Sequence, residues 1–305
     1  MGRLREDYFM KKVGFIGLGD MGMAMAKNLI KEGFDLIGYD LREEQLSTLE
    51  AAGGKRAGSL SEIGATADVV FIMVMTGKQV HSIISGEGGL LETMPAGKTI
   101  ILTATIEPSE ARAAYIPVAE KGVEMIDSPV SGGKGGAEAG SLAMMAAGKR
   151  DVWESQQDVM NAVGGNIFHV GEEVGKGQTV KASLQALIGS TFTAIFESLV
   201  LGSKAGIEGK VLYEVFAASG VSSPLFKNCA ELIMDRKFKG TGSQIKTMHK
   251  DLGITMGMAK ENGAAMFTTS AAYELFQSGI SMFPEEDNWS IVKLLEQIAG
   301  TEVKW

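Results

Sequence analysis

The chain has 305 residues, of which 45% are hydrophobic and 22% charged, and its formal net charge is -8. This balance indicates a folded globular chain of about two domains, and the acidic charge argues against a nucleic-acid-binding protein. Cys229 is the single cysteine, so an internal disulfide and a multi-cysteine metal cage are excluded, and three scattered histidines offer little for zinc. No metal is expected.

The sequence predicts neither a signal peptide nor a membrane-spanning helix. The first residues, MGRLREDYFMKK, are charged and contain no apolar segment of the kind found in a signal peptide. The longest uncharged helical run, residues 182–196, is shorter than the roughly 20 apolar residues that cross a bilayer. We therefore expect a cytoplasmic protein with no membrane partner, and we assign residues 1–11 to an N-terminal extension.

Residues 12–175 alternate short apolar runs with helical patterns. The continuous apolar runs are typical of parallel strands that are covered on both faces. We predict strands at 12–18, 34–40, 67–75, 98–105, 122–130, 141–148 and 165–171, and helices at 22–33, 42–53, 107–122 and 151–163. This alternation predicts right-handed βαβ units and a doubly wound α/β sheet.

Strand signals end near residue 175, and residues 176–305 are predicted to be all helical. Apolar residues recur at helical spacing from Val180 to Leu199, which predicts one helix of roughly 28 residues, far above the mean of ~11–12. Shorter helices are expected at 210–219, 224–235, 244–262, 267–282 and 286–299. The long helix would join the two domains or form a subunit interface, so we expect a homodimer or homotetramer.

The segment GLGDMG follows the first strand and opens the first helix. Gly17 would permit the tight turn, Gly19 would let the backbone approach a pyrophosphate, and Gly22 would allow the helix to pack closely on the strand. The free N–H groups of the helix N-terminus favour phosphate. The alternative is a purely structural turn. We predict a Rossmann dinucleotide-binding domain over residues 12–175, with contacts from Gly17, Leu18, Gly19, Asp20, Met21 and Gly22.

An acidic residue, Asp40, ends the second strand 18 residues after Gly22. At this position a carboxylate accepts hydrogen bonds from the adenosine ribose and repels a 2′-phosphate, which favours NAD over NADP. Arg42 lies two residues further and would soften that preference. The predicted cofactor is NAD, with NADP as the alternative.

Four segments together resemble the β-hydroxyacid dehydrogenases: GFIGLGDMG (14–22), TATIEP (103–108), DSPVSGGKGGAEAG (127–140) and KGQTVKASLQ (176–185). The second glycine segment is the most specific of the four. The resemblance implies that the Rossmann domain binds the cofactor and that the helical domain closes the substrate cleft. It also implies hydride transfer between NAD(P) and a small hydroxy acid, or the corresponding semialdehyde or oxo acid.

The glycine-rich segment after residue 130 is predicted to bind the substrate carboxylate. Gly132 and Gly133 would expose consecutive backbone N–H groups, which suit an anion, and Ser131 adds a hydroxyl donor. The resemblance implies this same role for the three residues. A flexible glycine loop without a ligand is the alternative.

Lys181 is predicted to be the catalytic residue, the role of the matching lysine in the family. Oxidation of a hydroxyl requires a proton to leave oxygen, and a desolvated ammonium can exchange a proton near neutrality. Gln185 lies one turn later and would bind substrate, and Gly189 would leave room for a ligand against the helix backbone. The alternative for Lys181 is an exposed helix lysine.

The sequence departs from the commonest family pattern at Gln185, where asparagine is usual, and residue 184 is Leu where relatives are often polar. The segment MVMTGKQV (73–80) also has no proline after its strand. These features favour the threonate-type branch, similar to L-threonate dehydrogenase, and put 3-hydroxyisobutyrate in doubt as the substrate. A four-carbon polyhydroxy acid is the expected substrate.

Further contacts are expected at the carboxyl ends of two strands and on a late helix. Thr105 would contact nicotinamide or substrate, or else cap the helix from Pro108. Val74, Met75 and Thr76 would end the preceding strand and line the cofactor site. KDLG (250–253) matches a family segment whose lysine, Lys250 here, reaches the cofactor and whose aspartate supports the site; a surface ion pair is the alternative.

Two other functions remain open from the residues. An imine reductase shares this architecture but would not need the lysine as a carbonyl acid. A catalytically silent dinucleotide-binding module would be expected to lose Lys181 and to carry extra partner-binding segments. His169, His249 and Cys229 are predicted to be structural, and Pro224 is predicted to begin a helix.

Overall fold

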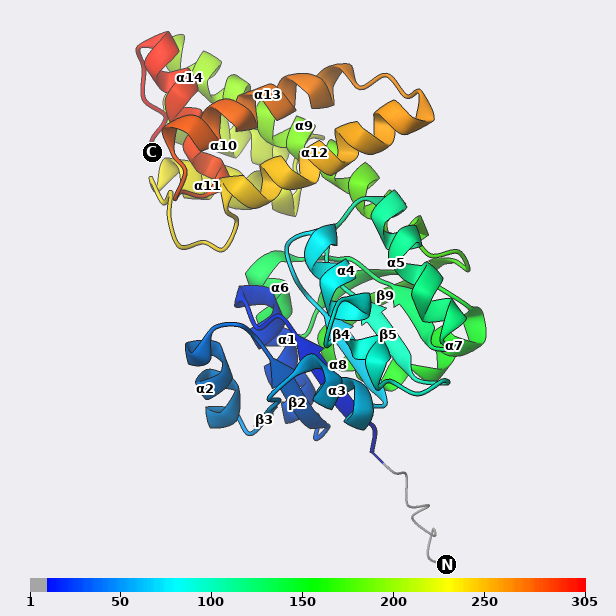
Figure 1. Cartoon of the computed structure of the whole chain (residues 1–305). Coiled ribbons are helices and arrows are strands. Elements are labelled where there is room, and N and C mark those ends of the chain that lie inside the picture. The colour runs from blue at the N-terminus through cyan, green and yellow to red at the C-terminus, as the bar shows by residue number, and fades with distance from the viewer. Residues whose placement is uncertain (1–9) are drawn as a thin grey trace, which may run out of the picture. The chain divides into compact units, whose positions relative to one another are not determined.

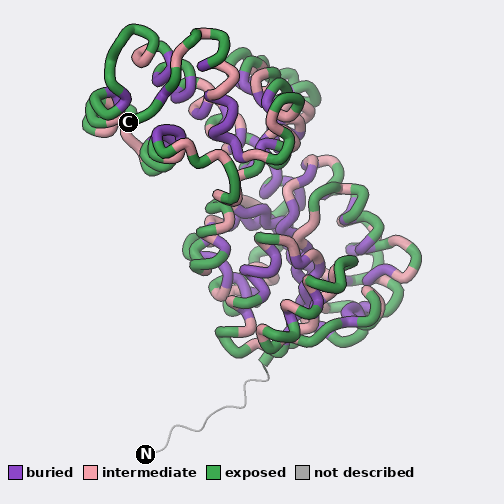
Figure 2. Tube along the Cα trace, turned by 90° about the vertical axis from the view of Figure 1, so that its left-hand side faces the viewer, coloured by how far each residue is buried: buried purple, intermediate pink, exposed green. Residues whose placement is uncertain are grey.

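The computed structural model describes residues 10–305, so most of the predicted N-terminal extension lies outside the described part of the chain. The structure divides into two compact units, one ending at Lys181 and the other beginning at Ala182. Figure 1 shows a mixed sheet and helix domain and a second domain that consists of helices. Each unit has its own buried core (Figure 2).

The first unit is built on one sheet with the strand order β3-β2-β1-β4-β5-β6-β8-β7, and β9 pairs with β8. The pairs among β1 to β6 are parallel, β8 runs antiparallel to β6 and β7, and β9 is parallel to β8. The strands are β1 (Lys12–Ile16), β2 (Asp35–Tyr39), β3 (Lys55–Arg56), β4 (Val69–Ile72), β5 (Thr99–Leu102), β6 (Glu124–Asp127), β7 (Val130–Ser131), β8 (Leu142–Ala147) and β9 (Gly164–Gly171).

Helices cover both faces of this sheet. One core contains residues of α1 (Asp20–Lys31), α2 (Glu43–Ala51), α6 (Gly133–Glu138) and α8 (Gln157–Val163). The other contains residues of α3 (Leu60–Thr66), α4 (Gly77–Ser85), η1 (Leu90–Glu92) and α5 (Pro108–Glu120). Figure 1 shows α2 and β3 at one edge of the domain and α7 (Arg150–Ser155) at the other. The doubly wound Rossmann architecture is therefore confirmed.

Several predicted elements differ in detail from the structure. The predicted strand 122–130 is two strands, β6 and β7, and the predicted helix 151–163 is two helices, α7 and α8. The sheet is not wholly parallel, because β8 reverses direction. The short helices α3, α4 and α6 were not predicted, since each has only six to nine residues and carries little periodic signal.

The second unit is all helical, as predicted. Its core includes Phe192, Phe196, Phe226, Phe276 and Trp289. The helices are α9 (Lys176–Lys204), which begins in the first unit, α10 (Gly209–Ala218), α11 (Pro224–Met234), α12 (Ile245–Asn262), α13 (Phe267–Met282), η2 (Asn288–Ser290) and α14 (Ile291–Ala299). The predicted helix 286–299 is thus a 3-10 turn followed by α14. Helices α12 and α13 lie side by side (Figure 1).

The long helix α9 has 29 residues, close to the predicted length. The expectation that its apolar run is too short for a membrane was wrong for the helix as a whole, because its length and composition do reach what a membrane crossing needs. Phe192, Ile195, Phe196, Leu199 and Val200 instead face the core of the second unit. These five apolar residues of α9 therefore have a structural use inside this domain.

Candidate active site

The glycine turn between β1 and α1 has the geometry that a dinucleotide needs. Gly17 adopts φ 89°, a left-handed conformation that favours glycine. A Cβ on Gly22 would meet the Gly17 carbonyl oxygen at 1.9 Å, so only glycine allows this approach of helix and turn. A Cβ on Gly19 would meet only Arg42, at 3.8 Å. The middle glycine is therefore open to a ligand, while the other two serve the fold.

The N-terminus of α1 is left without a side-chain cap. Its N-cap is Gly19, and no side chain accepts a hydrogen bond from the first turn. The N–H groups at this end, together with the helix dipole, suit a pyrophosphate. Leu18 is buried, whereas Asp20 is exposed at the first position of the helix and Met21 is half-buried. The residues present thus fit a bound dinucleotide.

Asp40 stands at the carboxyl end of β2 beside this turn. Its Oδ2 accepts a hydrogen bond from the Leu18 backbone N–H at 2.7 Å. Arg42 donates from Nε and Nη2 to the two carboxylate oxygens at 2.9 and 3.0 Å. Burial raises the pKa of the Asp40 carboxyl, but the hydrogen bonds from Arg42 and Leu18 outweigh it and leave the pKa below its ordinary value. The carboxylate is therefore charged at neutral pH.

The segment after β4 was assigned wrongly to a strand. β4 ends at Ile72, and Val74, Met75 and Thr76 lie in the connection to α4. Thr76 is the N-cap of α4, and it forms a reciprocal capping box with Gln79. The three residues still follow the carboxyl end of a central strand, where ligands of open α/β sheets bind. Their contact with a cofactor stays a prediction.

Thr105 likewise lies beyond its strand, because β5 ends at Leu102. The alternative role of capping the next helix is wrong: the N-cap of α5 is Glu107, whose side chain forms a capping box with Glu110. Thr105 is half-buried and follows the carboxyl end of β5. This position is at the same edge of the sheet as the glycine turn, since β1, β4 and β5 are parallel neighbours.

The predicted carboxylate cradle follows β6 and β7 at the sheet edge. Ser131 ends β7, where it pairs with Ala143 of β8. Gly132 and Gly133 have φ values of 136° and 60°, both in the region that favours glycine, and α6 begins at Gly133. Both glycines are exposed, and a Cβ on Gly133 would meet nothing within 4 Å. The segment leads directly into a helix, and its contact with a carboxylate stays a prediction.

Lys181 is buried, with 6% of its surface exposed, so it is not the exposed helix lysine of the alternative interpretation. It lies in the second turn of α9 and belongs to the first unit. Gln178, one turn earlier, donates a hydrogen bond from Nε2 to Asp127 Oδ1 at 2.7 Å. The start of α9 is thereby attached to the carboxyl end of β6, the strand that precedes the cradle.

In the second unit, a buried polar group connects α9 and α12. Gln185 Nε2 donates to Asp251 Oδ2 at 2.6 Å, and Lys250 Nζ lies 2.9 Å from Asp251 Oδ1. Gln185 and Asp251 are 7% and 4% exposed. The ion pair of the alternative interpretation is therefore present, but it is not an ordinary surface pair, because the Asp251 carboxylate is inside the domain.

The expectation of ligand space at Gly189 was also wrong. A Cβ at this glycine would meet Leu252 Cδ2 at 2.8 Å and Met248 Cε at 3.1 Å. Gly189 therefore allows α9 and α12 to pack closely. The space that its missing side chain leaves is filled by protein.

His169 and His249, which were predicted to be structural, both contact other residues of the protein. His169 Nε2 contacts the Gly148 carbonyl oxygen at 2.8 Å, and its Nδ1 contacts Arg150 at 3.2 Å. The His249 ring stacks on Tyr273 with centroids 4.7 Å apart. Burial lowers the pKa of His249, against the opposing effect of a hydrogen bond with Gln277. Within residues 10–305, no cluster of three or more metal-ligating side chains occurs.

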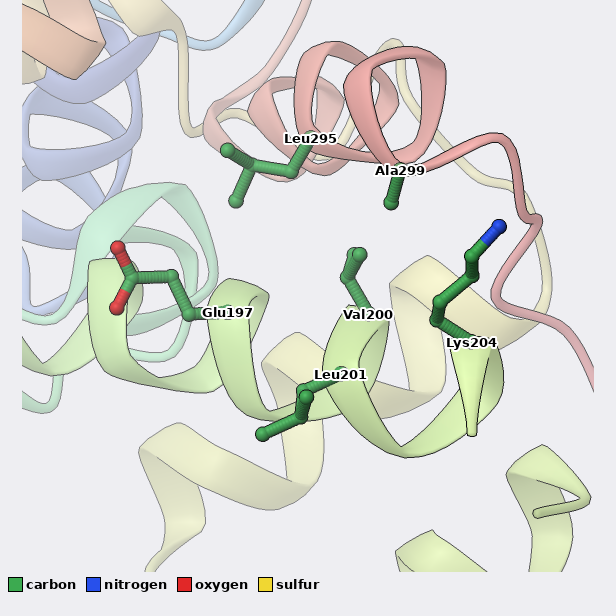
Figure 3. Close-up of a pocket in the computed structure, with 6 residues that line it drawn as sticks. All are labelled: Glu197, Val200, Leu201, Lys204, Leu295 and Ala299. Atoms are coloured by element: carbon green, nitrogen blue, oxygen red, sulfur yellow. The ribbon is translucent and has the colours of Figure 1, made fainter. Parts of the chain in front are cut away.

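A cavity of about 270 Å³ lies elsewhere, between α9 and α14. It is lined by Glu197, Val200, Leu201, Lys204, Leu295 and Ala299. Figure 3 shows Leu295 and Ala299 of α14 facing α9, with Glu197 and Lys204 at opposite ends. None of the predicted site residues lines this cavity, so it is not the predicted substrate site.

The sequence interpretation missed two buried polar residues, Asp127 and Gln178, and it missed that Gln185 is the partner of Asp251, although it expected that aspartate to support the site. Asp127, Gln178 and Gln185 lie inside segments that carry the family resemblance. Asp127 carries one available signal, since it is a charged residue directly after an apolar strand run. Such a residue is buried at a cost and therefore has a specific partner or a function.

Two family models match the chain. One, described as the NAD binding domain of 6-phosphogluconate dehydrogenase, matches residues 12–171. The other, described as the NAD-binding of NADP-dependent 3-hydroxyisobutyrate dehydrogenase, matches residues 175–295. The first match covers the Rossmann domain with its glycine turn, and the second covers α9 and most of the helices that follow it.

Similar proteins extend over nearly the whole chain. 2-(Hydroxymethyl)glutarate dehydrogenase of Eubacterium barkeri is 34% identical over 96% of this chain and 97% of its own length. L-threonate dehydrogenase of Cupriavidus necator is 32% identical over 94% of this chain and 97% of its own. The structure of 3-hydroxyisobutyrate dehydrogenase from Mycobacterium tuberculosis with L-serine has a TM-score of 0.87 at 27% identity, over 94% of this chain and 99% of that one.

The chain therefore belongs to the β-hydroxyacid dehydrogenase family, whose members are NAD(P)-dependent oxidoreductases. The resemblance inferred from the four segments is confirmed, and so is NAD(P) as the cofactor. The same relatives support a dehydrogenase over an imine reductase or a silent binding module.

Proposed function

We propose that this dehydrogenase oxidises a four-carbon polyhydroxy acid of the threonate type. The observation that carries the proposal is the orientation of the Gln185 amide, whose nitrogen donates to both Asp251 Oδ2 and Met248 Sδ. Because a primary amide has two N–H groups, only its carbonyl oxygen is left for a ligand. That oxygen accepts a hydrogen bond from a further substrate hydroxyl.

The similar proteins are named for several hydroxy acids, and two of these, L-threonate and L-serine, carry an extra hydroxyl or ammonium group. Threonate carries additional hydroxyls, and L-serine carries an ammonium, whereas 3-hydroxyisobutyrate has neither. One relative is named L-threonate dehydrogenase. Another, a 3-hydroxyisobutyrate dehydrogenase, was solved with L-serine. A carbonyl oxygen at Gln185 suits a hydroxyl or an ammonium and repels a second carboxylate.

The chain's own residues then have distinct tasks. Gly17, Gly19 and the N-terminus of α1 hold the pyrophosphate of NAD(P), which supplies the hydride acceptor when bound. Ser131 and the N–H groups of Gly132 and Gly133 bind the substrate carboxylate. Lys181 Nζ takes the proton of the reacting hydroxyl during oxidation and returns it during reduction.

We further propose NAD as the preferred cofactor. The Asp40 carboxylate is charged at neutral pH and stands beside the glycine turn, where it would repel the 2′-phosphate of NADP. Arg42 is held by that carboxylate through two hydrogen bonds, so its charge is already compensated. This arrangement supports discrimination against the phosphate.

The test is a panel of acids assayed with NAD and with NADP: L-threonate, D-threonate, L-serine, 3-hydroxyisobutyrate and 2-(hydroxymethyl)glutarate. We expect the highest kcat/KM with a threonate isomer and NAD. A preference for 3-hydroxyisobutyrate, or turnover of none of these acids despite cofactor binding, would contradict the proposal. A preference for L-serine would retain the role of Gln185 but change the substrate.

We also propose that the protein forms a homo-oligomer, and that the interface is the surface of α9 and α14 around the cavity between these helices. Leu201 and Ile298 on these helices are 72% and 76% exposed, although both are apolar. Glu197 and Lys204 lie two turns apart on α9 at the two ends of the cavity (Figure 3). A two-fold axis that pairs two copies of α9 in antiparallel fashion would bring each glutamate to the lysine of the other copy.

Light scattering after size-exclusion chromatography tests this interface. Glu197→Lys and Lys204→Glu should each weaken the oligomer, and the double variant should restore it. A mass that is unchanged in both single variants would contradict this surface. We propose in addition that the protein acts in the cytoplasm, which fractionation of cells that express the tagged chain would measure.

A further inference from the structure

Asp127 has an unusual environment for a carboxylate. It is the last residue of β6, and no part of it is exposed. Its Oδ2 accepts hydrogen bonds from the backbone N–H groups of Gly175, at 2.9 Å, and Gln178, at 3.1 Å. Its Oδ1 accepts one from Gln178 Nε2 at 2.7 Å. The carboxylate therefore caps the N-terminus of α9 from the end of a central strand.

Gln178 extends the same connection to the neighbouring strand. Its Nε2 also donates to the Ala104 carbonyl oxygen at 2.9 Å, and its Oε1 accepts from the Ile106 N–H at 3.1 Å. Both residues belong to the segment that follows β5. The amide uses both N–H groups and its oxygen, so the first turn of α9 is fixed at the carboxyl ends of both β5 and β6.

The start of α9 also lies very close to the backbone of the sheet. Gly177 lies between the two capped N–H groups, and a Cβ there would meet the Met145 carbonyl oxygen at 2.4 Å and the Asp127 carbonyl oxygen at 2.6 Å. Any side chain at this position would push the helix away from the sheet. Asp127, Gly177 and Gln178 thus form one junction, which we call the α9 latch.

A buried charge is more than a helix cap requires. Two other helices of this chain, α3 and α11, are capped by neutral serines, Ser59 and Ser223. Burial raises the pKa of Asp127 to about 6, although the hydrogen bonds from Gln178, Gly175 and Gly177 act in the opposite direction. A folded-state pKa above the unfolded value means that this group's contribution to stability is lost as the pH rises through about 6. Ionisation of Asp127 at neutral pH therefore costs folding stability, and the hydrogen bonds from the start of α9 offset part of that cost.

The junction fixes the part of α9 that carries Lys181. This lysine follows Gln178 by three positions on α9, so it lies one turn beyond the latch on the same side of the helix. We propose that Asp127 and Gln178 are positioning residues, which hold the first turn of α9 at the sheet edge and thereby place Lys181 Nζ for proton exchange with substrate. This inference rests on the proposed function, because it assumes that Lys181 moves the proton.

The experiment compares Asp127→Asn with the unchanged chain. An asparagine keeps the size of the side chain but turns one acceptor oxygen into a donor that faces the N–H groups of the helix. We expect kcat to fall by about 100-fold, the effect of a misplacement near 1 Å, while KM and the NADH dissociation constant change less than twofold. Gln178→Met is the second variant and keeps the test available if Asp127→Asn does not fold.

Ser59→Ala is the matched control. It removes the serine hydroxyl that accepts the Glu62 N–H at 3.1 Å, so it deletes a helix cap in the same domain. We expect it to lower the melting temperature and to leave kcat unchanged. A kcat loss in Ser59→Ala equal to that in Asp127→Asn would show that the effect is general destabilisation and would overturn the proposal.

Hydrogen exchange without substrate separates this inference from the proposed function. Amides of residues 175–181 should exchange about tenfold faster in Asp127→Asn than in the unchanged chain. If the unchanged chain oxidises no hydroxy acid, the proposed function fails, while the exchange result still decides whether the latch exists. Unchanged exchange over this segment, or an unchanged kcat in Asp127→Asn and Gln178→Met, would overturn the positioning role.

Discussion

Gln185 Nε2 donates a hydrogen bond to Asp251 Oδ2 at 2.6 Å across two helices of the C-terminal domain. The same nitrogen donates to Met248 Sδ at 3.6 Å. Since the Gln185 nitrogen donates to this carboxyl oxygen, the contact fixes which way the amide points. The amide nitrogen is therefore used by protein acceptors, and the substrate contact proposed for Gln185 is assigned to its carbonyl oxygen.

Replacing Gln185→Asn tests this orientation. Asparagine is one methylene shorter. Its amide therefore cannot keep the hydrogen bond to Asp251 and also place its oxygen where the Gln185 oxygen would accept from the substrate hydroxyl. We expect the ratio of kcat/KM for L-threonate to that for 3-hydroxyisobutyrate to fall about 3- to 10-fold, the value of one hydrogen bond. Gln157→Asn, on α8 of the other domain, is the control. An unchanged ratio would show that Gln185 does not select the substrate.

The local parts of the site could be predicted from the sequence. The glycine turn is encoded in six consecutive residues that follow a strand, and Asp40 stands at the end of the next strand along the chain. The long helix α9 carries many periods of the apolar pattern, so its existence and length were predicted closely. Patterns of this kind depend on neighbours within a few residues.

The missed features depend on residues far apart in the sequence. Asp127 and Gln178 are separated by 51 positions, and Gln185 and Asp251 by 66. Each polar side chain looks like an ordinary helix or strand-end residue until the fold brings its partner close. The reversal at β8 was missed for the same reason, because an apolar run alone does not give a strand's direction.

The glycine turn allows folding and cofactor binding to be separated by mutation. Gly22→Ala would place its Cβ 1.9 Å from the Gly17 carbonyl oxygen, so we expect a loss of about 3 kcal/mol or more in the free energy of unfolding. Gly19→Ala meets no such contact and has an ordinary backbone conformation with φ -69°. It should unfold like the unchanged chain but bind NADH at least about tenfold more weakly.

Thermal unfolding and NADH fluorescence titration measure the two quantities on the same samples. If Gly19→Ala binds NADH with unchanged affinity, the backbone at this glycine does not approach the pyrophosphate. If both variants lose stability equally, then Gly19 is packed as tightly as Gly22, and the proposal that Gly19 is left open for a ligand is wrong.

Asp40→Ser should shift cofactor preference toward NADP. The substitution removes the charge that repels a 2′-phosphate and releases Arg42 from its two hydrogen bonds, so the guanidinium can bind that phosphate. We expect the ratio of kcat/KM with NAD to that with NADP to fall at least about tenfold. Asp35→Asn, at the exposed start of the same strand, is the control and should leave the ratio unchanged.

The sign of the pH effect follows from the lowered pKa of Asp40. Because that pKa is below the ordinary value, the carboxylate stays charged throughout the neutral and alkaline range. The preference of the unchanged chain for NAD should therefore be constant from about pH 6 to 9 and decrease only in more acidic solution. A ratio that varies strongly within the neutral range would assign the discrimination to another group.

Lys181→Ala tests the proton transfer itself. If Nζ exchanges the hydroxyl proton, its removal should lower kcat by roughly 10²- to 10⁴-fold, whereas NADH affinity should change little, because the dinucleotide is held by the glycine turn and α1. Lys176→Ala provides the control on the first turn of the same helix, where the lysine is exposed and pairs with Glu173. Steady-state rates and NADH titration on the three proteins separate the two effects. Should Lys181→Ala keep most of its activity, the proton must leave by another group, and the placement of α9 by Asp127 would have no catalytic purpose.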